Sequence, residues 1–148
     1  MTKTKKFLSR EHFISCVRVY SDGACRCNPG PSSIGVVLYD GSGNELARFS
    51  QVLGTSTSNA AEYEAVIQGL DLAAKFTRHG VECYLDSDIV EGQIAGRYRL
   101  KSDRLRPLFH KVKDLERPFS RVSYIKVRNN DQRHALAHKL AHDALNGR

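Results

Sequence analysis

The sequence predicts an α/β fold in which a mixed β-sheet carries helices on its faces. Two observations lead to this prediction. Short β-branched segments with alternating polarity are interleaved with longer segments of helical periodicity, in the order βββαβααβα. In addition, no internal repeat, linker or low-complexity segment interrupts the 148 residues, so one domain is expected. This order requires a mixed sheet with helices packed against it.

The first three strands are predicted to form an antiparallel meander. VRVYSDG at 17–23 alternates and is β-branched, which predicts a strand that ends at Asp22. The turn cluster CNPGP at 27–31 follows, and two further strands at 34–40 and 46–53 are joined by a Gly-Ser-Gly-Asn turn.

The remaining elements alternate between helix and strand. Asn59 is expected to cap a helix that runs to about Arg78, with Gly80 as its stop signal. Pro118 is expected to end a later helix. After the Asn59 helix, the predicted elements are a strand at 81–86, helices at about 89–95 and 103–115, a strand at 122–127 and a helix at 133–145. Because parallel crossovers are right-handed, the first and fourth strands can lie side by side at the centre of the sheet.

The ends of the chain and its composition restrict the class of protein. Residues 1–15 are basic and lack a sustained apolar period, which predicts a flexible lead before a domain at 16–148. The lead has no apolar secretory core, and no stretch approaches the roughly 20 apolar residues of a membrane helix, so we expect a cytoplasmic protein without a membrane partner. The spacing of the cysteines matches no common zinc or disulfide pattern, and reduced thiols are expected at Cys16, Cys25, Cys27 and Cys83.

The net charge of +7 is unevenly distributed. Residues 97–148 contain 14 Lys and Arg against five Asp and Glu, so this third carries +9 and the rest carries −2. Such a distribution suits a polyanionic partner. On charge alone, a solvated basic surface explains it equally well.

Three carboxylates stand at positions where a purely structural role would be unusual. Asp22 and Asp86 each follow an apolar strand. Glu62 shares a helical face with Val66 and Leu70, at i+4 and i+8, so it is expected on the core-facing stripe. The carboxyl ends of parallel strands one and four converge at the edge where ligands usually bind.

The chemistry of such a cluster differs from that of a single acid. One acid at any of these positions is compatible with a helix cap or with strand-end solvent contact. Three converging carboxylates repel one another, and divalent cations with oxygen ligands relieve that repulsion. Glu64, on another side of the same helix, is expected to be solvated.

Several ordered motifs resemble the type 1 ribonuclease H family, over about residues 17–145. YSDGACRCNPGPSSIGVVLYD is similar to the family's opening strand and Asn-Pro-Gly turn, and TSNAAEYEAVIQGL to its Asn-x-x-Glu helix. YLDSDIVEGQIAG is similar to its Asp-Ser segment, and LRPLFHKV and HALAHKLAHDAL to its last helices. The resemblance implies a five-stranded mixed sheet, two Mg²⁺ or Mn²⁺ ions, and hydrolysis of the RNA strand of RNA–DNA hybrids that leaves 5′-phosphate ends. Asp22 would bridge both ions, and Glu62 and Asp86 would be further ligands.

The resemblance also implies substrate contacts. Asn28 and Asn59 would contact the minor groove of the hybrid, where 2′-hydroxyls distinguish RNA from DNA. Thr57 would lie near a phosphate of the DNA strand. Arg128 stands at the spacing of a flexible-loop histidine of some members, where it can hold a phosphate or simply be a solvated loop cation. Asp88 stands where a substrate-contacting glutamine is common, and either a spare ligand or a helix N-terminal acid explains it.

The sequence departs from the family pattern in its last helix. His138 stands at the position of the fourth active-site Asp and is expected to be the fourth ligand. Asp143 is five residues further and is rotated by about 140°, so it is no substitute. His134, His138 and His142 form an i, i+4, i+8 stripe, which as a zinc motif lacks further ligands of defined spacing.

These observations predict a monomeric endonuclease that hydrolyses the RNA strand of RNA–DNA hybrids. The chain has three of the family's four active-site acids. The alternative is a module of the same fold that binds hybrids but cleaves them weakly or not at all, because the fourth acid is absent. A third hypothesis, a zinc-binding structural domain, depends only on the histidine stripe. The three surviving acids favour the enzyme.

Overall fold

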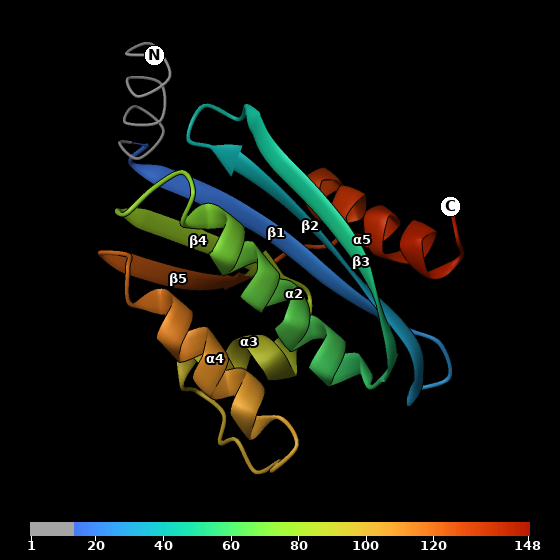
Figure 1. Cartoon of the computed structure of the whole chain (residues 1–148). Helices are drawn as coiled ribbons and strands as arrows, with labels where there is room; N and C mark the ends of the chain where they lie inside the picture. Colours follow the sequence, from blue (N-terminus) through green and yellow to red (C-terminus); the bar gives the residue numbers. More distant parts are fainter. Residues whose placement is uncertain (1–13) are drawn as a thin grey trace, which may run out of the picture.

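The computed structural model describes residues 14–148 and contains a five-stranded mixed sheet with helices on both faces (Figure 1). The predicted fold class and element order are therefore confirmed. The elements are β1 (Cys16–Cys25), β2 (Gly30–Asp40), β3 (Glu45–Ser56), α2 (Ser58–Ala73), β4 (Gly80–Leu85), α3 (Asp88–Ala95), α4 (Arg106–Glu116), β5 (Arg121–Lys126) and α5 (Gln132–Leu145).

The sheet order β3-β2-β1-β4-β5 places β1 at the centre, as the sequence predicts. β1 and β2 are antiparallel, as are β2 and β3, whereas β4 is parallel to both β1 and β5. In the β1–β2 register, Asp22 lies opposite Gly35. Because β1 and β4 are parallel, their carboxyl ends point the same way, and the residues near those ends lie at one edge of the sheet.

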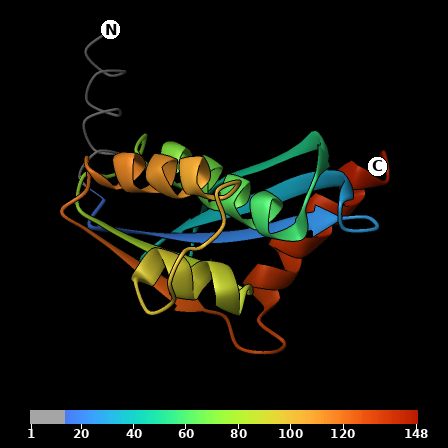
Figure 2. The same ribbon diagram turned by 90° about the horizontal axis from the view of Figure 1, so that it is seen from below.

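Two apolar layers hold the helices to the sheet. α2 and α4 lie over one face and α5 over the other (Figure 1, Figure 2). Alternate residues of β1 face opposite layers: Val17 and Val19 pack with α2, and Tyr20 packs with Ala137 of α5. The central strand is therefore buried on both sides, which makes it a rigid platform for polar residues near its end.

Two glycines of the sheet allow helices to approach the backbone closely. A Cβ atom at Gly35 would lie 2.1 Å from the carbonyl oxygen of Ala137 in α5. A Cβ at Gly23 would lie 2.5 Å from the carbonyl carbon of Ala61 in α2. Both contacts are far below normal van der Waals separation, so only glycine permits these helix positions.

Some predicted boundaries were wrong. Thr57, not Asn59, is the N-cap of α2, because its side chain accepts a hydrogen bond from Ala60 N. The helix ends at Ala73, well before Arg78. The buried Thr77 hydroxyl instead donates to the Ile14 carbonyl and accepts from His79 N, which directs the chain into β4.

β1 also extends beyond its predicted end at Asp22, because its pairing with β2 continues to Cys25. Asp22 is therefore inside the strand. α4 begins at Arg106 rather than about Asp103, with Pro107 in its first turn, where a missing N–H costs no helical hydrogen bond.

Part of the predicted flexible lead, residues 1–13, lies outside the described residues. Ser15, at its end, accepts a hydrogen bond from Gly80 N at 3.0 Å and is joined to the start of β4. The four cysteine thiols are free, as expected. Within residues 14–148, the helices are too short or too polar to cross a membrane.

Candidate active site

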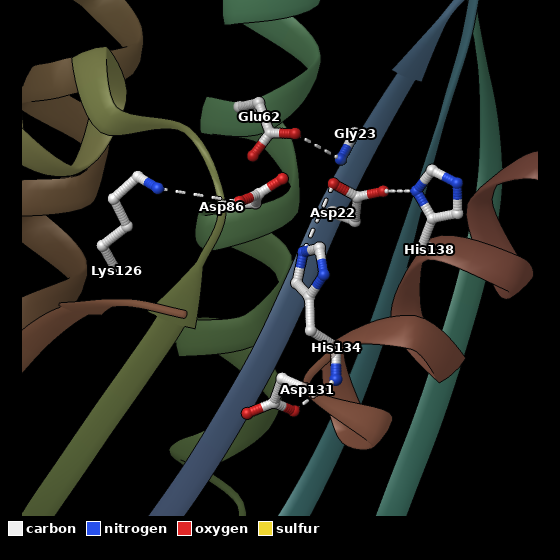
Figure 3. A network of polar contacts seen from close by, with 8 residues as sticks. All are labelled: Asp22, Gly23, Glu62, Asp86, Lys126, Asp131, His134 and His138. Carbon is white, nitrogen blue, oxygen red and sulfur yellow. Dashed lines mark hydrogen bonds and ion pairs between the residues drawn. The ribbon is translucent and has the colours of Figure 1, made fainter. Parts of the chain in front are cut away.

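Asp22 is a buried carboxylate on the central strand, on the face that α5 covers. Its Oδ2 atom lies 2.7 Å from Nδ1 of His138, and its Oδ1 atom lies 3.5 Å from Nε2 of His134 (Figure 3). Burial raises the pKa of Asp22, but contacts with His134, Glu62 and His138 together outweigh this effect and hold the pKa below its usual value. The site therefore favours the ionised form of Asp22.

Glu62 reaches Asp22 from the opposite layer. It lies on α2 one turn after the Thr57 cap, and its Oε1 atom accepts a hydrogen bond from Gly23 N at 3.0 Å. Its Oε2 atom is buried without a hydrogen-bond partner among the described residues. Burial, and next the charge of Asp22, hold the pKa of Glu62 well above its usual value. This oxygen therefore needs either a proton or a cation.

Asp86 is the most exposed of the three acids. It is the first residue after β4, and 58% of its side chain is exposed. Figure 3 shows its carboxylate beside those of Glu62 and Asp22, as the parallel arrangement of β1 and β4 predicts. The Nζ atom of Lys126, at the end of β5, lies 3.9 Å from Oδ1 of Asp86. At this distance and exposure the two side chains form only a weak ion pair.

Asp131 fixes the start of α5 and so positions both histidines near Asp22. Its side chain caps the helix by accepting hydrogen bonds from Arg133 N and His134 N. Burial lowers the pKa of His134, but Asp22, with smaller contributions from Asp86 and Asp131, outweighs burial and raises the pKa overall. Asp143 instead pairs with Lys139 at 2.5 Å, so it does not occupy the fourth position, in agreement with the prediction.

A cavity of about 210 Å³ opens beside these side chains. Arg128, a residue that the sequence predicts to contact the substrate, lines this cavity together with His134 and His138. The residues that line it are Asp86, Val127, Arg128, Asn129, Asn130, Asp131, His134, Ala135 and His138. The sequence did not predict the contribution of the 129–131 loop.

The predicted substrate residues at the start of α2 form a second group. Asn28 Oδ1 accepts a hydrogen bond from Ser58 N at 2.9 Å, which ties the turn after β1 to the helix that carries Asn59. Thr57 lines a cavity of about 420 Å³ here, together with Pro29, Thr55, Ser56, Ala60 and Arg104. The N-terminus of α2 and the Arg104 guanidinium give this cavity a positive character.

Asp88 differs from the other predicted residues. Its carboxylate accepts a hydrogen bond from the Tyr98 hydroxyl at 2.9 Å, and it lies in the first turn of α3, where the helix dipole stabilises an acid. These contacts fit a helix N-terminal acid better than a spare ligand.

The donor set fits a divalent cation. Asp22, Glu62 and Asp86 offer carboxylate oxygens, and the buried Oε2 atom of Glu62 has an unused lone pair directed into the cluster. His138 adds an imidazole nitrogen at the position expected for the fourth ligand. Besides the 129–131 loop, the sequence analysis did not assign His134, which contacts Asp22, or Lys126 to the site. The periodic histidine stripe was the available signal for His134.

Comparisons with known proteins agree with this architecture. A family model described as reverse transcriptase-like matches residues 20–144. Ribonuclease HI of Halobacterium salinarum is 35% identical over 130 residues, which cover 86% of this chain and 65% of that protein. The bifunctional protein Rv2228c of Mycobacterium tuberculosis is also 35% identical over 130 residues, covering 87% of this chain and 35% of that protein. The chain thus spans less than two thirds of the length of both curated relatives.

Solved structures give the same result. The crystal structure of RNase H1 from Halobacterium salinarum has a TM-score of 0.84 at 34% identity, covering 90% of this chain and 99% of that one. LC11-RNase H1, in complex with an RNA/DNA hybrid, has a TM-score of 0.82 at 31% identity, covering 88% and 97% of the two chains. The chain therefore belongs to the type 1 ribonuclease H family.

Proposed function

We propose that this chain is an endonuclease that hydrolyses the RNA strand of RNA–DNA hybrids and leaves 5′-phosphate and 3′-hydroxyl ends. The observation that carries the proposal is the convergence of Asp22, Glu62 and Asp86 at one edge of the sheet, with His138 beside them (Figure 3). Burial and the charge of Asp22 raise the pKa of Glu62, and a buried carboxyl group of this kind is costly to a fold that does not use it. A hybrid-bound relative, LC11-RNase H1, supports the substrate class.

Asp22, Glu62, Asp86 and His138 would hold two Mg²⁺ or Mn²⁺ ions. Such ions supply activation of the attacking water and stabilisation of the charge that develops in an in-line displacement. The protein's own part is positioning. The Gly23 N–H holds one oxygen of Glu62 and leaves the other directed into the cluster. The Asp131 cap fixes α5, and with it the approach of His138 to Asp22.

The substrate would lie across the edge from the carboxylates to the start of α2. Asn28 and Asn59 would meet the minor groove, where 2′-hydroxyl recognition selects RNA, and the Ser58 N–H···Asn28 Oδ1 hydrogen bond that ties the turn to α2 supports this assignment. Thr57 lines the positively charged cavity that also contains Arg104, which suits a DNA-strand phosphate. Arg128, in the cavity beside Asp86, is proposed to hold an RNA phosphate.

One observation favours a second candidate, a hybrid-binding module with little cleavage. His138 Nδ1 contacts Asp22 Oδ2 at 2.7 Å, so the carboxylate with the central role already has a close partner. Ion binding by Asp22 must compete with this contact. The competition predicts weak activity with Mg²⁺, which prefers oxygen ligands, and better activity with Mn²⁺, which accepts nitrogen.

A cleavage assay separates the two candidates. A hybrid labelled on its RNA strand is incubated with the protein and either Mg²⁺ or Mn²⁺, alongside an equal amount of duplex DNA. The nuclease proposal predicts RNA fragments with 5′-phosphate ends and intact duplex DNA. Hybrid binding without fragments under either metal would favour the binding module, and equal cutting of both duplexes would contradict the proposed specificity.

A further inference from the structure

α5 presents a second potential metal-binding group that uses only one of the three acids. Ligand atoms of Asp22, His138 and His142 all lie within 4.8 Å of one another. The rings of His138 and His142, one helical turn apart, have centroids separated by 4.1 Å and are tilted by 41°. Two imidazoles and one carboxylate therefore already converge without any movement of the backbone.

The chemistry of this group differs from that of the carboxylate cluster. Two histidines at i and i+4 on one helix face are a common chelating pair for Zn²⁺, and a carboxylate completes three protein ligands with one position left open. Imidazole nitrogen suits Zn²⁺, Ni²⁺ and Cu²⁺, whereas Mg²⁺ prefers oxygen. The same helix thus offers a nitrogen-rich set beside an oxygen-rich one, and the two sets share Asp22.

We propose that Asp22, His138 and His142 form a Zn²⁺ site, and that Zn²⁺ bound there inhibits the nuclease by occupying Asp22. The binding part stands independently of the proposed function, whereas the inhibition rests on it. His142 distinguishes the two ligand sets, because it belongs to the nitrogen-rich group and has no place among the proposed nuclease ligands.

The positions of the neighbouring residues indicate which histidine would bind Zn²⁺ together with His138. His134 approaches the other oxygen of Asp22, Oδ1, at 3.5 Å, and it is not part of the group whose ligand atoms lie within 4.8 Å of one another. Asp143, the neighbour of His142, is held by Lys139 at 2.5 Å. The expected ligand set is therefore His138 and His142 with Asp22, and not His134.

Direct binding tests the site. Zinc chloride is titrated into the metal-free protein in competition with a chromophoric chelator, and thermal unfolding verifies that each variant is folded. We expect one Zn²⁺ per chain, a Kd at least about tenfold higher in His142→Ala, and an unchanged Kd in His110→Ala, which removes an exposed histidine of α4. An unchanged Kd in folded His142→Ala, or a larger loss in His134→Ala than in His142→Ala, would overturn the assignment.

Cleavage assays test the inhibition separately. With Mg²⁺ or Mn²⁺ present, added Zn²⁺ should inhibit hybrid cleavage by the natural sequence, and half-inhibition should need at least about tenfold more Zn²⁺ in His142→Ala, relative to its own uninhibited rate. Cleavage that persists at Zn²⁺ concentrations saturating the binding assay would overturn the inhibition. Absence of cleavage with every metal, together with His142-dependent Zn²⁺ binding, would contradict the proposed function and leave the Zn²⁺ site supported.

Discussion

The Nδ1 atom of His138 lies 2.7 Å from the Oδ2 atom of Asp22, and this contact joins the last helix to the central strand at the candidate active site. The resemblance to the family predicts a fourth active-site acid at position 138. This chain instead has His138 there, which is a hydrogen-bonding partner of Asp22. A carboxylate in its place would add repulsion to a cluster in which the pKa of Glu62 is already raised. We therefore expect this contact to stabilise the metal-free fold and to compete with ion binding at Asp22.

The first prediction follows from this contact. His138→Asp supplies an oxygen ligand and frees Asp22, so Mg²⁺-supported hybrid cleavage should rise by at least about tenfold. The same change removes the His138–Asp22 hydrogen bond and adds a like charge, so the melting temperature in chelator should fall by about 2–8 °C. Both quantities come from one variant, by hybrid cleavage and thermal unfolding. An unchanged or lower Mg²⁺ rate would show that residue 138 is not a ligand position.

The second prediction concerns Glu62 and pH. The folded state raises the pKa of Glu62, so it binds the proton more tightly than the unfolded chain does. The stability that this provides is complete below the unfolded pKa and is lost as pH rises toward the folded pKa, at up to about 1.4 kcal/mol per pH unit. Glu62→Gln cannot ionise and keeps an oxygen for Gly23 N. Its gain in free energy of unfolding over the natural sequence should therefore be small near pH 4 and large at pH 7.

Urea unfolding in chelator at several pH values measures this gain. Glu64→Gln is the matched control on the same helix turn, because Glu64 is only partly buried, whereas Glu62 is buried. An equal gain at pH 4 and pH 7, or an equal gain in both variants, would contradict the account of Glu62.

The third prediction tests how closely α5 must approach the sheet. Gly35→Ala places a methyl group against the backbone of Ala137 and Ala141, so α5 must shift and carry His138 away from Asp22. Overpacking of this kind should cost about 1–3 kcal/mol of unfolding free energy and lower hybrid cleavage. Gly41→Ala is the control, because nothing lies within 4 Å of its added Cβ. Equal stability and cleavage in the two variants would mean that the close approach has no role.

The fourth prediction concerns phosphate binding near Thr57. Arg104 lines that cavity and should neutralise about one phosphate of the bound hybrid. Arg104→Ala should therefore weaken hybrid binding and reduce the slope of log Kd against log salt concentration by about one. Arg78→Ala, before the start of β4 and at the opposite end of that strand from Asp86, should leave the slope unchanged. The measurement is a salt series of hybrid titrations in chelator, and equal slopes in both variants would contradict a phosphate contact of Arg104.

The sequence predicted the fold and most of the candidate site because both depend on strong local patterns. The β-branched run at 17–23 predicts β1, and the crossover rule makes β4 its parallel neighbour, so the positions of Asp22 and Asp86 follow. The helical period likewise gave the inward direction of Glu62, which the structure confirms. Asn59 was a wrong choice of cap because Thr57, Ser58 and Asn59 are all good capping residues, and only the backbone conformation selects among them.

Contacts between distant segments could not be predicted in this way. The approach of His134 and His138 to Asp22 depends on the depth at which α5 packs, which Gly35 and the capping Asp131 set together. The extension of β1 past Asp22 depends on its pairing with β2, a non-local contact. The hydroxyl of Tyr98, ten residues from Asp88, is likewise placed beside it only by the turn after α3.

We propose above all that Asp22 is essential for hydrolysis of the hybrid, and the Asp22→Asn variant tests this role. The variant and the natural sequence are compared on one hybrid with a labelled RNA strand, measuring binding in chelator and cleavage with Mg²⁺ or Mn²⁺. We expect RNA fragments from the natural sequence, whereas Asp22→Asn should bind the hybrid with a similar Kd and produce no fragments. Cleavage by Asp22→Asn at the natural rate, or intact RNA with the natural sequence under both metals, would contradict it.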